Sequence, residues 1–207
     1  VTEAAVLART FPNLAIPAYD ALFFTAPRTV QVRRLTRNCG GLEPGQVELQ
    51  TVQSMISTGT ELKFFRGTFA QGESEALDAT IEALADQGAA GYPMQYGYSL
   101  VGLVVGAGRG VDLKKFVGRL AFSFQPHVSA CVVPVDGLML VPRGIDAADA
   151  VFLPAMETAL CIAHDAHPRA GESVVVFGQG LIGLLVTAIL ARCMGMRVTA
   201  VDGYATR

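Results

Sequence analysis

The stretch SVVVFGQGLIGLLVTAILARCMGMRVTAVD, residues 173–202, decides the fold class of this chain. Residues 173–177 (SVVVF) are rich in β-branched side chains and predict a short strand. Residues 184–194 predict a helix that ends at Gly195, and residues 197–202 predict a second strand. A strand, a glycine turn, a helix and a strand within about 30 residues make one βαβ unit, so this part of the chain is of the α/β class.

The hexapeptide GQGLIG lies between the first strand and the helix and matches the pattern G-x-G-x-x-G. Gly178 permits the tight turn, Gly180 lets a pyrophosphate approach the backbone, and Gly183 lets the helix pack on the strand. The helix N-terminus, with the backbone N–H groups of Leu181 and Ile182, offers a positive dipole end to the phosphates. The turn predicts a nucleotide site; the alternative is a glycine-rich turn without a ligand.

Asp202 ends the second predicted strand, 19 residues after the third glycine. A carboxylate at this place can accept both ribose hydroxyls of a dinucleotide, and it repels a 2′-phosphate. We therefore expect NAD as the cofactor and NADP as the less favoured one, with Arg207 close enough in sequence to soften that preference. The same carboxylate disfavours an NADPH-dependent enzyme of the quinone-reductase kind.

The chain before this unit is rich in β-forming residues. Alternation and turn residues predict strands at 28–35, 44–57, 98–106 and in three pieces of 118–141, with one helix at 73–87. An Ala-rich helical segment follows, and we place a domain boundary near residues 145–152. The expected domains are an N-terminal extension (1–27), a β-rich domain (28–150) and a dinucleotide-binding domain (151–207).

Composition excludes several classes of protein. The 207 residues are 51% hydrophobic, enough for a sizeable core, and their 16 basic and 18 acidic residues leave a net charge of −2. This balance argues against nucleic-acid binding by phosphate neutralisation. The longest apolar stretch, Gly180 to Ala191, is shorter than the roughly 20 residues that a membrane helix needs.

The four cysteines contain no C-x-x-C pair, so no zinc ribbon or disulfide framework is indicated. We expect four reduced, mostly buried thiols and an intracellular, reducing compartment. Residues 1–20 carry two prolines and no secretory pattern. They are compatible with the remnant of a plastid or mitochondrial targeting sequence and equally with a local extension.

Four segments in the right order resemble landmarks of the medium-chain dehydrogenase/reductase superfamily. They are STGTE (57–61), GYSLVGLVVGAG (97–108), SFQPHVSACVVP (123–134) and ETALCIAHDAHPRAGESVVVFGQGLIG (157–183). The resemblance implies a GroES-like β-rich domain followed by the first βαβ unit of a Rossmann domain. Because a complete Rossmann domain has six strands, we expect an incomplete, C-terminally truncated member, either as a fragment or with its open sheet edge covered.

The family's zinc ligands have no counterpart here. Where zinc alcohol dehydrogenases carry Cys, His and a third Cys or Glu, this sequence matches Thr58, Tyr98 and Leu153. None of these is a zinc ligand, so we expect no metal site. STGTE and GYS.VG look most like the zinc-free subgroup around bacteriochlorophyllide a dehydrogenase, whose members oxidise a tetrapyrrole hydroxyethyl group.

The resemblance implies hydride transfer from a secondary alcohol to nicotinamide, which needs a proton acceptor and hydrogen-bond donors. Thr60 matches the hydroxyl that relays the alcohol proton in zinc relatives, and Tyr98 replaces the His ligand with a phenol. His127 is a further candidate base, with a surface strand histidine as the alternative. The phenylalanines near residue 65 are expected to form core or cleft wall, or a platform for a flat, apolar substrate.

Two functions stay open at this point. The first is a zinc-independent NAD(P)-dependent oxidoreductase that acts on an apolar small molecule, with the open sheet edge covered in a homo-oligomer. The second is a non-catalytic accessory or structural subunit of a larger complex, in which a protein partner covers the open sheet edge. Binding of NADH favours the first function, and a stable complex with a partner but without nucleotide favours the second.

Overall fold

The computed structural model describes residues 16–37, 40–68 and 91–205. The helix expected at 73–87 lies outside these residues. Contacts divide the chain into two compact units, which we call unit 1 (through Val151) and unit 2 (from Phe152). We describe each unit by itself.

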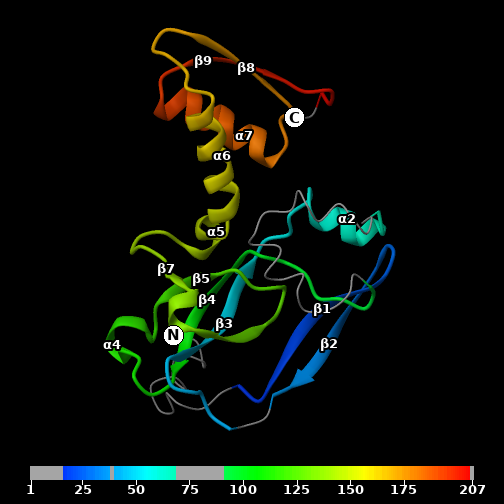
Figure 1. Cartoon of the computed structure of the whole chain (residues 1–207), viewed down its shortest axis with the longest axis vertical. Helices are drawn as coiled ribbons and strands as arrows, with labels where there is room; N and C mark the ends of the chain where they lie inside the picture. Colours follow the sequence, from blue (N-terminus) through cyan, green and yellow to red (C-terminus); the bar gives the residue numbers. More distant parts are fainter. Residues whose placement is uncertain (1–15, 38–39, 69–90, 206–207) are drawn as a thin grey trace. The chain divides into compact units, whose positions relative to one another are not determined.

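Unit 1 is built on a five-stranded antiparallel sheet with the strand order β6-β3-β4-β5-β7 (Figure 1). Strand β3 lies next to the central strand β4 on one side and β6 on the other, although β6 follows it by some 80 residues in sequence. The strands are β3 (Gln46–Ser54), β4 (Leu100–Ala107), β5 (Leu120–Ser123), β6 (Ala130–Pro134) and β7 (Met139–Leu140).

A second sheet of unit 1 is the antiparallel ribbon of β1 (Ala18–Ala26) and β2 (Thr29–Thr36). Strand β1 lies within the stretch that we expected to be an N-terminal extension, and this part of the prediction is wrong. The side chains of Ala21 and Phe24 are buried in unit 1, and the backbones of these two residues form isolated β-bridges with Val128 and Met94. The strand was missed because its sequence, AYDALFFTA, has no regular alternation of apolar and polar residues.

The core of unit 1 lies on the β3, β4 and β6 strands. Val47 and Leu49 of β3 contact Leu100 and Val104 of β4, and Val133 of β6 completes the cluster. Burying such aliphatic side chains contributes about 1.5–3 kcal/mol each. The alternation of apolar residues that predicts these strands is the same pattern that fills this core.

Short helical segments connect the strands: α2 (Glu61–Arg66), α4 (Leu113–Phe116), η2 (Val135–Gly137) and α5 (Ala147–Ala150). Helix α2 was not predicted from the sequence. Gly67 ends α2 in the left-handed region, with φ of 69°, and its N–H bonds to the Phe64 carbonyl. Glycine at this position permits the stop.

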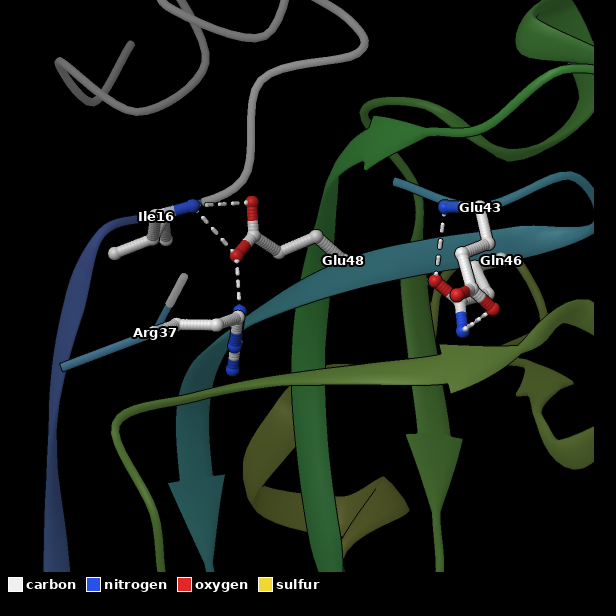
Figure 2. Close-up of polar contacts among 5 residues, drawn as sticks. All are labelled: Ile16, Arg37, Glu43, Gln46 and Glu48. Carbon is white, nitrogen blue, oxygen red and sulfur yellow. Dashed lines mark hydrogen bonds and ion pairs between the residues drawn. The ribbon is translucent and has the colours of Figure 1, made fainter. Parts of the chain in front are cut away.

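Glu48 of β3 is a charged residue inside unit 1, with no exposed surface. Its two carboxylate oxygens accept the Ile16 N–H at 2.8 and 2.9 Å, and one of them accepts the Arg37 guanidinium at 2.8 Å (Figure 2). Burial raises the pKa of Glu48, and the Ile16 N–H and the Arg37 charge oppose the shift. The carboxylate thereby joins β3 to residues at the start of β1 and the end of β2.

Unit 2 contains α6 (Leu153–Asp165), β8 (Ser173–Phe177), α7 (Leu181–Ala188), η3 (Ile189–Cys193) and β9 (Arg197–Val201). The predicted order of strand, turn, helix and strand is confirmed. Strands β8 and β9 are parallel and pair from Ser173–Arg197 to Phe177–Val201. One sheet face packs on a core formed by Ala159, Ala163, Val186, Ile189 and Leu190.

The cysteines are less buried than we expected. Cys131 of β6 is buried, but Cys161 and Cys193 are exposed on unit 2. Cys161 lies on the side of α6 opposite the small residues that face the core. Within the described residues, no helix is long and apolar enough to cross a membrane.

Candidate functional site

The glycine turn of unit 2 lies between β8 and α7, and two of its glycines are required by geometry. Gly178 has a φ of 86°, a left-handed conformation that side chains disfavour, and its N–H bonds to the Val201 carbonyl at 2.7 Å. A Cβ on Gly183 would lie 1.8 Å from the Gly178 carbonyl oxygen. The missing side chain therefore lets α7 approach the turn, as the sequence pattern predicts.

Gly180 is the N-cap residue of α7, and no side chain caps this helix. The first bond into the helix runs from the Leu184 N–H to the Gly180 carbonyl at 2.9 Å. The N–H groups of Leu181, Ile182 and Gly183 belong to the first helical turn, which has no internal acceptor for them. A Cβ on Gly180 would meet no atom within 4 Å, so this glycine leaves open space beside the N–H groups.

Gln179 was not predicted to be a structural residue, but its side chain stabilises the glycine turn by hydrogen bonds. Its side chain is buried, its amide nitrogen donates to the Val176 carbonyl at 3.2 Å, and its amide oxygen accepts the Thr187 hydroxyl at 3.2 Å. These bonds tie the turn to both β8 and α7. In the sequence, Gln179 is visible only as a polar residue between two glycines. The pattern G-x-G-x-x-G allows any residue at this position.

Asp202 follows β9 and lies against the same turn. One carboxylate oxygen accepts the Gln179 N–H at 2.5 Å, and the other accepts the Tyr204 N–H at 2.8 Å. The carboxylate is therefore fixed beside the first glycines of the turn. A carboxylate at this edge can accept the ribose hydroxyls of a dinucleotide. The helix N-terminus beside it suits the phosphates.

The predicted catalytic residues lie in unit 1. Thr60 is the residue before α2, and its side chain makes no capping hydrogen bond to the helix. Glu61 closes this turn instead, because one of its carboxylate oxygens accepts the Ser57 N–H at 2.7 Å. The backbone N–H of Glu61 in turn donates to the Ser57 carbonyl at 2.9 Å.

His127 is buried in a bend just before β6 and is not a surface strand residue. Its Nδ1 lies 2.9 Å from the Ser54 hydroxyl, and its Nε2 lies 2.9 Å from a Glu61 carboxylate oxygen. Both ring nitrogens are thus engaged by side chains of unit 1. The carboxylate neighbour was not expected from the sequence, because 66 residues separate the two.

Tyr98 is half-buried and packs edge-to-face on Tyr96, with ring centroids 6.4 Å apart. Tyr96 also packs on Phe64 of α2 at 4.1 Å. Its hydroxyl is buried and has no hydrogen-bond partner among the described residues. Burial raises the pKa of Tyr96, and the nearby Tyr98 and Glu61 raise it further, so the phenol stays protonated.

Comparison with known proteins gives the fold. Acetophenone reductase from Geotrichum candidum, solved with NAD, superimposes with a TM-score of 0.70 at 19% identity, over 93% of this chain and 60% of the other. A short chain alcohol dehydrogenase from Escherichia coli, solved with NADH, gives 0.67 at 14% identity, over 92% and 64%.

The chain shares the fold of these two oxidoreductases.

Sequence comparison is more limited. D-xylulose reductase A from Aspergillus oryzae is 39% identical over 90 residues, which are 41% of this chain and 25% of that protein. The chain thus matches about a quarter of the length of this relative. No model of a known protein family matches the chain.

The residues present do not fit the zinc ion of zinc-dependent medium-chain dehydrogenases. Of the matched positions, Thr58 is exposed, Tyr98 is half-buried and Leu153 is an exposed aliphatic side chain. Zinc needs sulfur, imidazole or carboxylate ligands. The part of the chain that the structure describes holds no cluster of three His, Cys, Asp or Glu residues suited to a metal ion.

Proposed function

We propose that the chain is part of an NAD-dependent oxidoreductase that transfers a hydride between a secondary alcohol and nicotinamide. The observation that carries this proposal is the glycine turn closed on Asp202, with the Gln179 N–H bonded to the carboxylate at 2.5 Å. The medium-chain dehydrogenase fold and the similarity to a D-xylulose reductase support it.

NAD is the proposed cofactor rather than NADP. The Asp202 carboxylate is fixed by two backbone N–H groups and cannot turn away from a ribose without losing them. Its charge repels a 2′-phosphate, whereas its lone pairs accept ribose hydroxyls. When bound, the nicotinamide accepts the hydride of the alcohol carbon.

The proposed reaction proceeds without zinc. Removal of the hydride leaves a carbonyl group, so the hydroxyl proton must pass to a base. Thr60 and Tyr98 are the proposed hydroxyl groups at the substrate oxygen. His127 is the proposed base, which the proton would reach through the Ser54 hydroxyl at its Nδ1. Tyr98 supplies a hydrogen-bond donor in place of a metal.

The proposed substrate is an apolar secondary alcohol, with a tetrapyrrole hydroxyethyl group as one member of that class. Half-buried aromatic side chains at the edge of a buried cluster support an apolar ligand. They are Phe65, Tyr92 and Tyr98, which pack against the core residues Phe24, Phe64 and Tyr96.

Binding of NADH and NADPH to the full chain, measured by calorimetry, tests the cofactor proposal. We expect wild-type protein to prefer NADH and Asp202→Asn to bind NADH at least tenfold more weakly, because a charge-assisted hydrogen bond contributes about 1.5–3 kcal/mol. The exposed acid Asp136 of unit 1 provides the control, since Asp136→Asn should leave both affinities unchanged.

Equal binding of NADH and NADPH would refute the assigned role of Asp202. A folded wild-type chain that binds neither nucleotide would refute the oxidoreductase proposal and favour a non-catalytic accessory subunit. Oxidation of secondary alcohols of increasing apolar size, followed by NADH absorbance, then tests the substrate class.

A further inference from the structure

Three polar side chains that are far apart in the sequence form one hydrogen-bonded network in unit 1. Ser54 ends β3, His127 precedes β6 and Glu61 opens α2. The His127 and Glu61 side chains are only 8% and 3% exposed. Such buried polar groups are stable only as a set, because removing one leaves its partner buried and unpaired.

The Glu61 end of the network controls the turn at residues 57–61. One carboxylate oxygen accepts the Ser57 N–H, and the other contacts His127. Thr60 lies inside the loop that Glu61 closes. The position of the Thr60 hydroxyl therefore depends on where His127 holds the Glu61 carboxylate.

The imidazole end controls the segment that carries Tyr98. Gly97 has a φ of 137°, and a Cβ built on it would lie 3.0 Å from both Cδ2 and Nε2 of His127. The ring thus lies directly against the Gly97 backbone. A shift of the ring would move Gly97 and with it the adjacent Tyr98.

We propose that the Ser54–His127–Glu61 network is a positioning device that holds residues 57–61 and 97–98 together for the reaction. The inference rests on the proposed function, since it concerns the same site. These two segments contain Thr58 and Tyr98, which match metal-ligand positions in zinc relatives and do not fit a metal here. The network links the segments that a metal ion would otherwise link: residues 57–61 by hydrogen bonds, and residues 97–98 by the contact of the His127 ring with Gly97.

Two variants of the full chain test this inference. Glu61→Gln keeps the size of the side chain but removes its charge, and His127→Gln removes the ring while keeping an amide. Ser123→Ala is the matched control, because it removes another buried hydrogen bond of unit 1, from the Ser123 hydroxyl to the Gly137 carbonyl at 3.0 Å.

We expect both network variants to lower kcat at least tenfold while the Kd for NADH stays within about twofold, since misplacement by about 1 Å can cost 10²-fold in rate. The amide NMR signals of Thr60 and Tyr98 should shift in both variants. The control should lower the melting temperature without changing kcat or these signals. A chelator should leave wild-type kcat unchanged.

Unshifted Thr60 and Tyr98 signals in folded Glu61→Gln protein would overturn the inference, whatever the activity. A kcat loss shared equally by Ser123→Ala, or inactivation of the wild type by the chelator, would also overturn it. Failure of the proposed function is distinct, because the wild type would then bind no NADH and the NMR comparison would still report whether the network holds the two segments.

Discussion

Gly180 and Gly183 stand three residues apart in one turn, but their surroundings are opposite. A Cβ on Gly183 would overlap the Gly178 carbonyl oxygen at 1.8 Å, whereas a Cβ on Gly180 would meet no atom within 4 Å. Gly180 also has an ordinary φ of −72°. The fold itself therefore requires glycine at position 183, whereas Gly180 leaves open space in which a ligand could lie.

We expect Gly183→Ala to destabilise unit 2 by about 3 kcal/mol, at the upper end for overpacking. Gly180→Ala should leave the melting temperature nearly unchanged and weaken NADH binding, because its methyl group enters the space that the pyrophosphate needs. Thermal unfolding and calorimetric titration of both variants give the comparison. Equal melting temperatures for the two variants would contradict this assignment of roles.

At the residue scale, the sequence predicted the turn better than the unit 1 site. The conformations of Gly178 and Gly183 and the place of Asp202 beside the turn follow from a local pattern whose geometry is set by one strand and one helix. The partners of His127 do not, because Ser54 and Glu61 lie 73 and 66 residues away in sequence. Only the pairing of strands brings such residues together.

At the scale of elements, Glu48 joins β3 to residues flanking the β1–β2 ribbon through Ile16 and Arg37 (Figure 2). Burial raises the pKa of this carboxyl above its ordinary value of 4.5. The folded state therefore binds the proton more tightly than the unfolded state does. Stability from this group is greatest below pH 4.5 and falls as pH rises through the raised pKa.

We therefore expect wild-type protein to gain stability relative to Glu48→Gln as pH falls from 7 towards 4.5, by about 1.4 kcal/mol for each unit of raised pKa. Urea unfolding of both proteins across this range measures the difference. The exposed Glu43 serves as control, since Glu43→Gln should show no such trend. A difference in unfolding free energy between wild type and Glu48→Gln that is constant with pH, or that favours the wild type more as pH rises, would contradict the raised pKa of Glu48.

The sequence predicts an element correctly where its apolar residues are also the residues that the fold buries. The strands β3, β4 and β8 follow from their apolar and β-branched residues, and each packs on a core. The helix α2 was missed because its six residues are too few for a helical period to be read. Its boundaries depend on the Glu61 carboxylate and on Gly67, whose importance emerges only in three dimensions.

At the scale of the whole molecule, the thiols distinguish the two units. Cys131 is buried in unit 1, whereas Cys161 and Cys193 are exposed in unit 2. Burial raises the pKa of Cys131 to about 12. At pH 8 only roughly one Cys131 thiol in ten thousand is the reactive thiolate.

Iodoacetamide at pH 8 should accordingly modify Cys161 and Cys193 in the folded protein, and Cys131 only when unit 1 unfolds. Peptide mapping by mass spectrometry along a urea series provides the measurement. The urea dependence of Cys131 labelling should follow the loss of the β-sheet signal. Labelling of Cys131 at the rate of Cys161 in native protein would show that the strand β6 opens locally.

The pairing of β3 with β6 affects the order in which the two units fold. Hydrogen bonds between these strands form only after some 80 intervening residues have been closed into a loop. Closing this loop costs conformational entropy before any contact between the strands can compensate for the loss. The β8–α7–β9 segment needs only about 30 neighbouring residues. During refolding of the complete chain, the glycine turn should thus acquire its shape early, whereas the network around His127 forms only when the last strands of unit 1 have paired.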